Sequence, residues 1–178
     1  MHHTLRFYGH NQHSILKWYM RLAQLTRVPL LGKLVRLVAN SYGKRFHHGY
    51  VLSLDDAEKI IDAAKTVAIG TCSCRHVFHN CEGPEMSEIV IGTGAEIFPE
   101  VRFGEFKHVS KEEAKKVMRQ CHDLKYIHTI QKCRDDFYAI CNCCSCCCVP
   151  LRLLRDHGIG SALVREKDIA AAVIRGLV

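Results

Sequence analysis

Six of the eight residues from Cys141 to Cys148 are cysteines, within the tract ICNCCSCCCVP at positions 140–150. Thiols at this density would oxidise to a mixture of disulfides unless something binds them, because adjacent cysteines are poor partners for strain-free bridges. The deprotonated cysteine side chain is also a metal ligand. The tract is therefore interpreted as a binding site formed by Cys141, Cys143, Cys144, Cys146, Cys147 and Cys148.

A second group of cysteines lies upstream, with the spacing Cys72-x-Cys74-x6-Cys81. Within the downstream tract, one trio follows C-x2-C-x2-C, the beginning of the bacterial ferredoxin pattern, but the closing x3-C-P is missing because residue 151 is leucine. The nine cysteines of the two groups are close to the eight that two [4Fe-4S] clusters require. We therefore predict two [4Fe-4S] clusters as cofactors, with all nine cysteines as candidate ligands.

The assignment of cysteines to each cluster depends on the course of the backbone. Consecutive side chains of an extended segment point to opposite faces, so one cysteine-rich strand or loop can serve a cluster on each side. The working hypothesis gives one cluster to Cys141, Cys144 and Cys147 with a neighbouring cysteine. The other cluster then takes Cys72, Cys74 and Cys81, together with Cys143 or Cys146.

Zinc is the main alternative, since four cysteines form a common structural zinc site. Zinc sites usually pair two separated C-x2-C elements, whereas the crowded sulfurs here favour sulfide-bridged iron; a metal-free thiol relay is a further alternative. His76 and His79 could replace a cysteine ligand, although a surface or core histidine is the favoured interpretation. Arg75 is either a hydrogen-bond donor to cluster sulfur or an ordinary exposed arginine. Cys121 and Cys133 are expected to serve packing.

Composition indicates one compact domain, because 178 residues that are 48% hydrophobic can bury a sizeable core. Eleven cysteines are too sparse for a short disulfide-stapled scaffold, and their number is odd. No signal peptide is visible, so we expect a reducing cytoplasm in which thiolates hold metal. Peripheral attachment at the inner membrane face is a further expectation.

Residues 1–54 contain eight Lys or Arg and no Asp or Glu, so their formal charge is +8. Because the whole chain has a net charge of +7, the remaining residues carry −1. Two amphipathic patterns occupy residues 13–40 on either side of Pro29, and no apolar run approaches the ~20 residues that span a bilayer. We expect residues 1–48 to form a basic helical extension. It would pack on the body, dock on an acidic protein or an anionic membrane, or serve as a transit peptide. Nucleic acid is an unlikely partner because aromatics are few.

In the remaining chain, residues 49–178, the order of helix and strand patterns predicts a small α/β or α+β domain. We expect a mixed sheet with flanking helices and with iron-sulfur sites in cysteine-rich loops. Capping patterns begin helices after Ser53 and Ser110. Buried strands are expected at 66–72, 88–94, 125–130 and 135–141. A helix, a glycine turn, a short strand and a final helix should follow Pro150.

The segments CSCRHVFHNC (72–81) and ICNCCSCCC (140–148), with SKEEAKKVMRQCHDLKYIH between them, resemble a group of poorly characterised iron-sulfur proteins from anaerobic bacteria and archaea. The resemblance covers about residues 50–165 and implies electron transfer through two [4Fe-4S] clusters, with the nine cysteines as matching positions. Many members have another cysteine where this chain has Met86, Ser87 and Glu88, which leaves one ligand open. Many also continue into a ferredoxin module, so a separate electron partner is expected here.

The leading hypothesis is therefore a small redox protein that relays single electrons to or from a larger enzyme of anaerobic metabolism. The alternative is an oxidoreductase whose atypical or incompletely ligated cluster reduces a disulfide or another sulfur compound. A cluster used for sensing or structure is a third class. No paired carboxylates, Ser-His-Asp set or phosphate loop indicates other chemistry, and no catalytic residue is identified.

Overall fold

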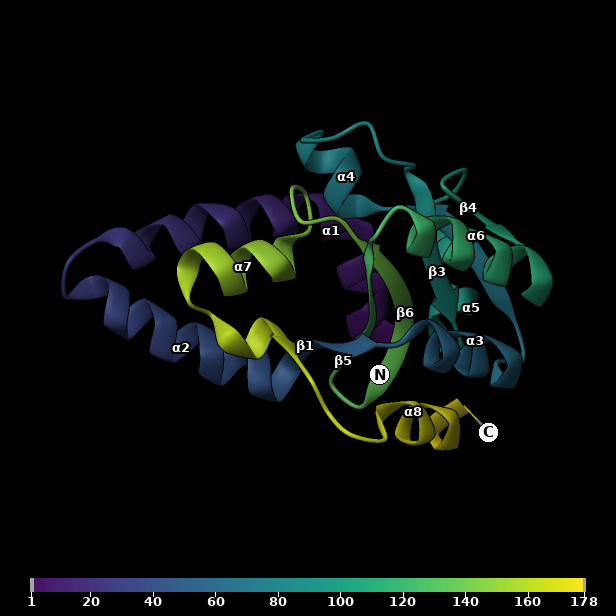
Figure 1. Cartoon of the computed structure of the whole chain (residues 1–178). Coiled ribbons are helices and arrows are strands. Elements are labelled where there is room, and N and C mark those ends of the chain that lie inside the picture. The colour runs from purple at the N-terminus through teal and green to yellow at the C-terminus, as the bar shows by residue number, and fades with distance from the viewer. Residues whose placement is uncertain (1, 178) are drawn as a thin grey trace.

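A computed structural model describes residues 2–177 and contains a seven-stranded mixed sheet of order β4-β2-β3-β6-β5-β1-β7 (Figure 1). All neighbouring strands are antiparallel except β1 and β7, which are parallel. The strands are β1 (His47–Leu52), β2 (Val67–Thr71), β3 (Met86–Ile91), β4 (Phe106–His108), β5 (Ile127–Cys133), β6 (Asp136–Cys143) and β7 (Leu163–Val164).

Helices cover both faces of this sheet, so the predicted mixed sheet with flanking helices is confirmed. One face packs against α3, α6 and α8, and the other against α1 and α5. The helices are α1 (His2–Ala23), η1 (Gln24–Arg27), α2 (Leu31–Phe46), α3 (Leu54–Ala63), α4 (Ser73–Phe78), α5 (Thr93–Val101), α6 (Lys111–Asp123), α7 (Val149–His157), η2 (Gly160–Ala162) and α8 (Ile169–Leu177).

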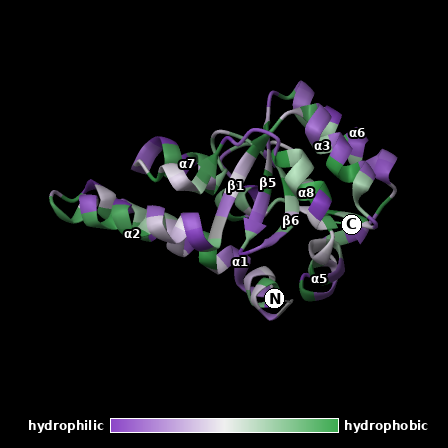
Figure 2. Ribbon diagram, turned by 90° about the horizontal axis from the view of Figure 1, so that it is seen from below, coloured by the Kyte–Doolittle hydropathy of each residue, from purple (hydrophilic) through white to green (hydrophobic). Residues whose placement is uncertain are grey.

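The central strands β3 and β6 are apolar on both faces because each face meets a layer of helices. Ile89 and Ile140 belong to the core under α3, α6 and α8, while Val90 and Ala139 belong to the core under α1 and α5. Successive side chains alternate across a strand, so burial on both faces requires a continuous apolar run. In Figure 2, green apolar positions alternate with purple hydrophilic ones along helices such as α2, α3 and α6.

Local capping places the two helices whose starts the sequence predicts. The Ser53 hydroxyl accepts a hydrogen bond from the Asp56 backbone N–H at 3.1 Å, and Ser110 accepts one from Glu113 at 3.2 Å. Each satisfies a donor that the first helical turn leaves without a partner. The helix, short strand and final helix expected after Pro150 are present as α7, β7 and α8.

Helix α5 is an element that the sequence patterns do not indicate. It contains Gly94 and Pro99, both of which disfavour a helix interior. A Cβ atom at Gly94 would lie 2.1 Å from the backbone oxygen of Tyr138, so only glycine lets α5 approach β6 this closely. The strand predicted over 88–94 ends at Ile91, because Gly92 has φ +50 and turns the chain into α5.

The basic N-terminal segment forms a helical hairpin. Helix α1 is longer than predicted and buries Leu5 and Leu16 against the body, whereas α2 extends away from the sheet (Figure 1). The break expected near Pro29 is present, since η1 ends at Arg27 and α2 begins at Leu31. The boundary at residue 48 stays a prediction. Within residues 2–177, no helix combines the length and apolarity needed to cross a membrane.

Candidate metal centre

Strands β2 and β6 bring the two cysteine segments together. Both are antiparallel neighbours of β3, so they run in the same direction and their C-terminal ends meet at one edge of the sheet. Cys72 follows β2 and precedes α4, while β6 ends at Cys143 and continues into the turn before α7. The sheet order therefore juxtaposes residues that lie about 70 positions apart.

Four cysteines form a compact set, here called group 1: Cys81, Cys144, Cys146 and Cys147. Their sulfur atoms all lie within 4.8 Å of one another, with 3.7 Å from Cys81 to both Cys144 and Cys147. The Cys146 and Cys147 sulfurs are 3.9 Å apart. Asn80 donates its side-chain amide to the Cys146 carbonyl at 2.8 Å and ties the upstream loop to this turn. The four thiols can bind a metal.

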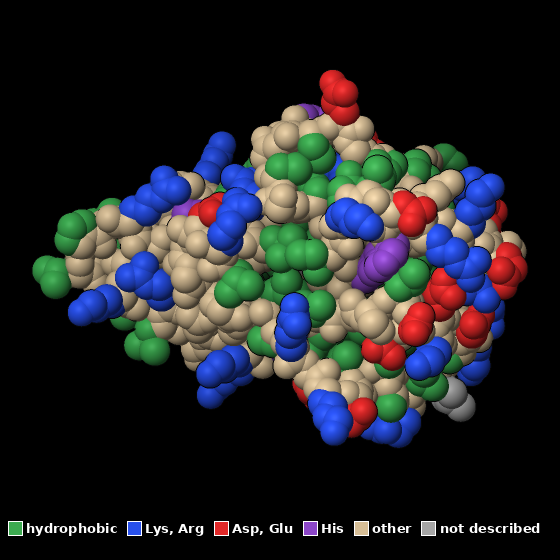
Figure 3. Space-filling model, in the orientation of Figure 1, with side chains coloured by type: hydrophobic (Ala, Val, Ile, Leu, Met, Phe, Trp, Pro, Cys, Tyr) green, Lys and Arg blue, Asp and Glu red, His purple; other side chains and the backbone are tan. Residues whose placement is uncertain are grey.

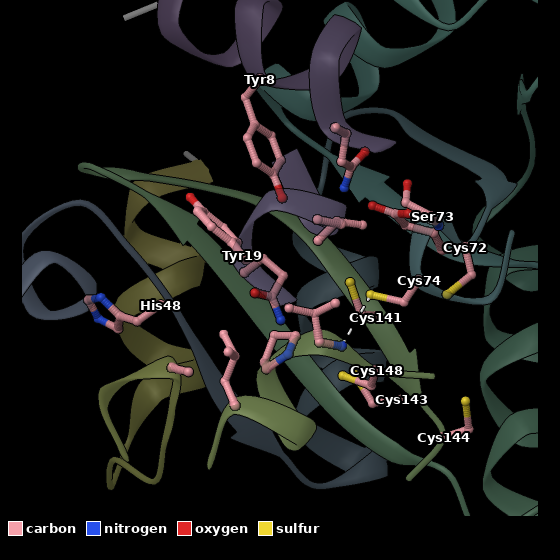
Figure 4. A pocket seen from close by; sticks show the side chains of 18 of the residues that line it. Tyr8, Tyr19, His48, Cys72, Ser73, Cys74, Cys141, Cys143, Cys144 and Cys148 are labelled. Carbon is pink, nitrogen blue, oxygen red and sulfur yellow. Dashed lines mark hydrogen bonds between the residues drawn. The ribbon is translucent and has the colours of Figure 1, made fainter. Parts of the chain in front are cut away.

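A small cavity of about 80 Å³ lies behind this turn, and Cys144 of group 1 is part of its lining. The other five cysteines also line it and are here called group 2: Cys72, Cys74, Cys141, Cys143 and Cys148. Figure 4 shows the sulfurs of Cys74, Cys141 and Cys148 turned toward a shared space, with Cys144 farther away. The Val149 backbone N–H donates to the Cys74 sulfur at 3.4 Å. Thr129 Oγ1 lies 3.5 Å from the Cys143 sulfur.

This grouping differs from the partition that spacing predicts. Cys81 lies with the downstream cysteines rather than with Cys72 and Cys74, because the six-residue helix α4 carries the chain away from the end of β2 before Cys81. Cys141 in turn lies with the upstream pair, since it is still part of β6. The turn after β6 begins between Cys143 and Cys144, so Cys143 belongs to group 2 and Cys144 to group 1.

Arg75 lies beside group 1 and is 1% exposed, so the alternative of an ordinary exposed arginine is wrong. Its guanidinium donates to Pro84 O, to Asn142 O and, at 2.5 Å, to Ser87 Oγ, and it stacks 4.7 Å from the Tyr126 ring centroid. Its Nε has no partner among the described residues. A buried cation with a free donor favours an anionic neighbour.

The electrostatics of Cys144 follow from this contact. Burial alone would raise the pKa of the Cys144 thiol, but hydrogen bonds from the Cys147 backbone and from Arg75 lower that pKa to about 6. Electrostatic interaction with Cys72 and the hydrogen bond to Cys144 raise the pKa of Arg75 despite its burial. Group 1 therefore contains a preformed thiolate, which is the form that binds metal.

Burial and mutual hydrogen bonds set the pKa values of the group 2 thiols. Burial raises the pKa of Cys72 and of Cys141. The pKa of Cys148 is raised chiefly by its hydrogen bonds with Cys143 and Cys74, while the bond from Cys148 lowers the pKa of Cys143. Cys143 and Cys148 are thus a hydrogen-bonded pair, and a bound cation would displace thiol protons here.

Two charged residues beneath group 2 were not indicated as functional by the sequence patterns. Glu88 is buried, and burial raises the pKa of its carboxyl, against an opposing effect of Arg102. Arg102 is also buried and donates to Gln12 at 2.8 Å and to Ser73 at 2.7 Å. The acidic residue in the otherwise apolar run EIVI at 88–91 is the sequence signal that could have identified this site.

The remaining candidates take structural roles. His76 and His79 are exposed beside Glu85, at 3.4 and 3.7 Å, and neither belongs to group 1. Cys121 and Cys133 are buried in α6 and at the end of β5, as expected for packing. The histidines accordingly stabilise a surface turn.

The donor chemistry of group 1 fits a thiophilic metal. Group 1 supplies four sulfurs, the number that a tetrahedral ion or a [4Fe-4S] cluster takes. Group 2 places five further thiols around the adjoining cavity. Arg75 adds positive charge beside the thiolates, which a negatively charged metal–thiolate complex would compensate.

No protein-family model matches this chain, and no curated protein or solved structure is significantly similar to it.

Proposed function

We propose that this chain is an iron-sulfur electron-transfer protein of the reducing cytoplasm, which relays electrons to or from a partner enzyme of anaerobic metabolism. The observation that carries the proposal is the gathering of nine cysteines, four with sulfurs within 4.8 Å of one another and five around the adjoining cavity. Two sets of this size match the ligand demand of two [4Fe-4S] clusters. Mononuclear structural sites would not require so many sulfurs in one place.

Group 1 would hold one cluster through Cys81, Cys144, Cys146 and Cys147. Group 2 would hold the other through four of its five sulfurs, leaving one as a hydrogen-bonding or exchange partner. When bound, such clusters supply single-electron transfer with little change of structure. The groups adjoin through the peptide bond between Cys143 and Cys144, so electrons would need to travel only a short distance between them.

The protein's own residues would control potential and access. Arg75 places a buried positive charge beside group 1, which favours the more negative, reduced state. Group 2 lies next to an internal cavity walled by Tyr8, Tyr138 and Leu16. Group 1 lies in a turn whose Ser145 is exposed and whose Cys146 is partly exposed. Group 1 is therefore the side at which a separate redox partner would exchange electrons.

Elemental analysis of protein purified without air tests the proposal. About eight irons and eight acid-labile sulfides per chain are expected for two clusters. Electron paramagnetic resonance of the dithionite-reduced protein should show signals that small thiols do not change. A thiol-dependent shift would instead favour an enzyme acting on sulfur compounds. Protein with zinc alone, or with no metal, would refute the proposal.

Matched variants assign the two sites. Cys81→Ser should lose the iron of group 1 while retaining that of group 2, whereas Cys121→Ser should retain both because Cys121 is a packing residue in α6. Equal iron loss in both variants would indicate a general folding defect instead of ligand removal.

Zinc in group 1 is a second candidate, favoured by one observation. Three of the six sulfur separations, at 3.7, 3.7 and 3.9 Å, are close to the edge of about 3.8 Å for a tetrahedron with Zn–S bonds of about 2.3 Å. The four sulfurs of a cube bind four different irons and lie farther apart. One zinc with about four irons per chain would assign group 1 to zinc and restrict electron transfer to group 2.

A further inference from the structure

The free end of the hairpin between α1 and α2 exposes large apolar side chains. Leu30 is 90% exposed and Leu37 is 68% exposed. Leu30 also has φ +65, a conformation that non-glycine residues rarely adopt. Burial within the body does not explain a leucine held in this strained and solvated position.

The apolar surface continues from this tip along both helices. Leu34, Val38 and Tyr42 repeat at four-residue intervals on α2 and are all exposed, as are Trp18 and Leu22 on α1. A groove of about 480 Å³ with a mainly apolar lining lies between the two helices and is closed on one side by Leu153, Ile159 and Ala162. Figure 3 shows hydrophobic side chains at the projecting end and along its edge. Exposed apolar patches of this extent mark interaction surfaces.

Basic side chains surround the apolar tip. Arg21, Arg27 and Lys33 are exposed, and residues 1–54 contain no acidic side chain to neutralise them. In Figure 3 the acidic side chains gather mainly on the opposite end of the molecule, over the sheet and its flanking helices. The hairpin is therefore both apolar and positively charged, while the remainder of the chain is near neutral.

We propose that this hairpin docks the protein on an anionic lipid bilayer, with the tip leucines inserted among the acyl chains and the basic residues at the headgroups. Apolar side chains flanked by Lys and Arg are the pattern that interfacial helices present to anionic membranes. Docking orients the body above the bilayer. The inference does not depend on the metal content of the two cysteine groups.

An acidic protein would be a poorer match to the same surface. Its carboxylates could pair with the basic residues, but Leu30 and Leu37 are 90% and 68% exposed and are not among the residues that line the groove. A rigid partner would have to fill the groove and also cover these two leucines, whereas lipid acyl chains adapt to both.

Vesicle binding by the full chain tests this assignment. Flotation with vesicles of phosphatidylcholine alone and with 30% phosphatidylglycerol should show roughly tenfold or greater preference for the anionic vesicles. The preference should shrink in 1 M salt, where the Debye length falls to about 3 Å. Trp18 is the single tryptophan, so brominated acyl chains should quench its emission on binding.

Paired variants separate the apolar and electrostatic contributions. Replacing Leu30, Leu34 and Leu37 together by serine should weaken binding roughly 100-fold. The pair Arg27→Gln and Lys33→Gln should weaken binding to anionic vesicles roughly 25-fold and leave neutral vesicles unaffected.

The matched control is Phe103→Ser with Lys116→Gln, which removes a 92% exposed aromatic and an exposed lysine beyond the hairpin. It should change binding less than twofold. Absence of binding to anionic vesicles, or equal loss in the control and the leucine variant, would overturn the proposal. Binding to poly-glutamate but not to vesicles, weakened by Lys33→Gln, would assign the surface to an acidic protein instead.

Discussion

Replacement of Arg75 by methionine is the most direct test of how the cysteine loops are held. The substitution keeps a long side chain but removes the charge and every donor. The carbonyls of Pro84 and Asn142 would lose their hydrogen bonds to the guanidinium, and the Ser87 hydroxyl would lose another. These three groups join the upstream loop to strands β3 and β6.

The magnitude follows from the two acceptors on buried residues, Asn142 and Ser87, because Pro84 is an exposed residue. Each buried acceptor left without a donor costs about 1–3 kcal/mol. Removal of a buried cation whose Nε is unpaired offsets part of this loss. We expect the free energy of unfolding of the metal-free protein to fall by about 3 kcal/mol, and that of the metal-loaded protein to fall further because the thiolates lose their countercharge.

Urea unfolding under strictly reducing conditions measures this change. The control is Arg119→Met, since Arg119 is exposed and pairs with Glu58 at 2.7 Å on the surface. Exposed pairs contribute about 0–1 kcal/mol, so this variant should be nearly neutral. Alkylation of Cys144 below pH 8 should also slow in Arg75→Met, because the pKa of that thiol rises when the guanidinium is absent. An Arg75 variant as stable as the Arg119 control, with unchanged Cys144 reactivity, would refute the reasoning.

Three further outcomes are expected. In the metal-free protein, the lowered pKa of Cys144, about 6 when folded against about 9 when unfolded, should raise the free energy of unfolding by about 2 kcal/mol from pH 7 to 8.5. Above pH 9 stability should fall, because the buried thiols with raised pKa stay protonated only in the folded state; a flat urea-midpoint profile would contradict this. Gly94→Ala should lower the melting temperature sharply by forcing a methyl group against β6, whereas Gly160→Ala, with open space around it, should not. Leu5→Ala should lower the free energy of chemical unfolding by about 2–4 kcal/mol, and Leu37→Ala, at an exposed position, by less than about 0.5 kcal/mol. An equally small effect of both variants would show that α1 separates from the body without unfolding it.

Local patterns were sufficient for elements that are stabilised by near neighbours in the sequence. The serine caps at Ser53 and Ser110 act within one helical turn, and the apolar runs of β3 and β6 follow from burial on both faces. Helix α5 was missed because Gly94 and Pro99 oppose a helix locally. The close approach of α5 to β6 overrides that preference, and such packing has no local signature.

The sequence by itself determined that sulfur chemistry dominates this chain, because no packing requirement explains six cysteines in eight residues. It also determined that the N-terminal segment is basic and broken near Pro29. Only the tertiary structure decided which cysteines face one another and that Arg75 is buried among them. The physical reason is that β2 and β6 pair with opposite edges of β3. This pairing is set by long-range burial, and it brings together thiols whose spacing along the chain says little about their separation in space.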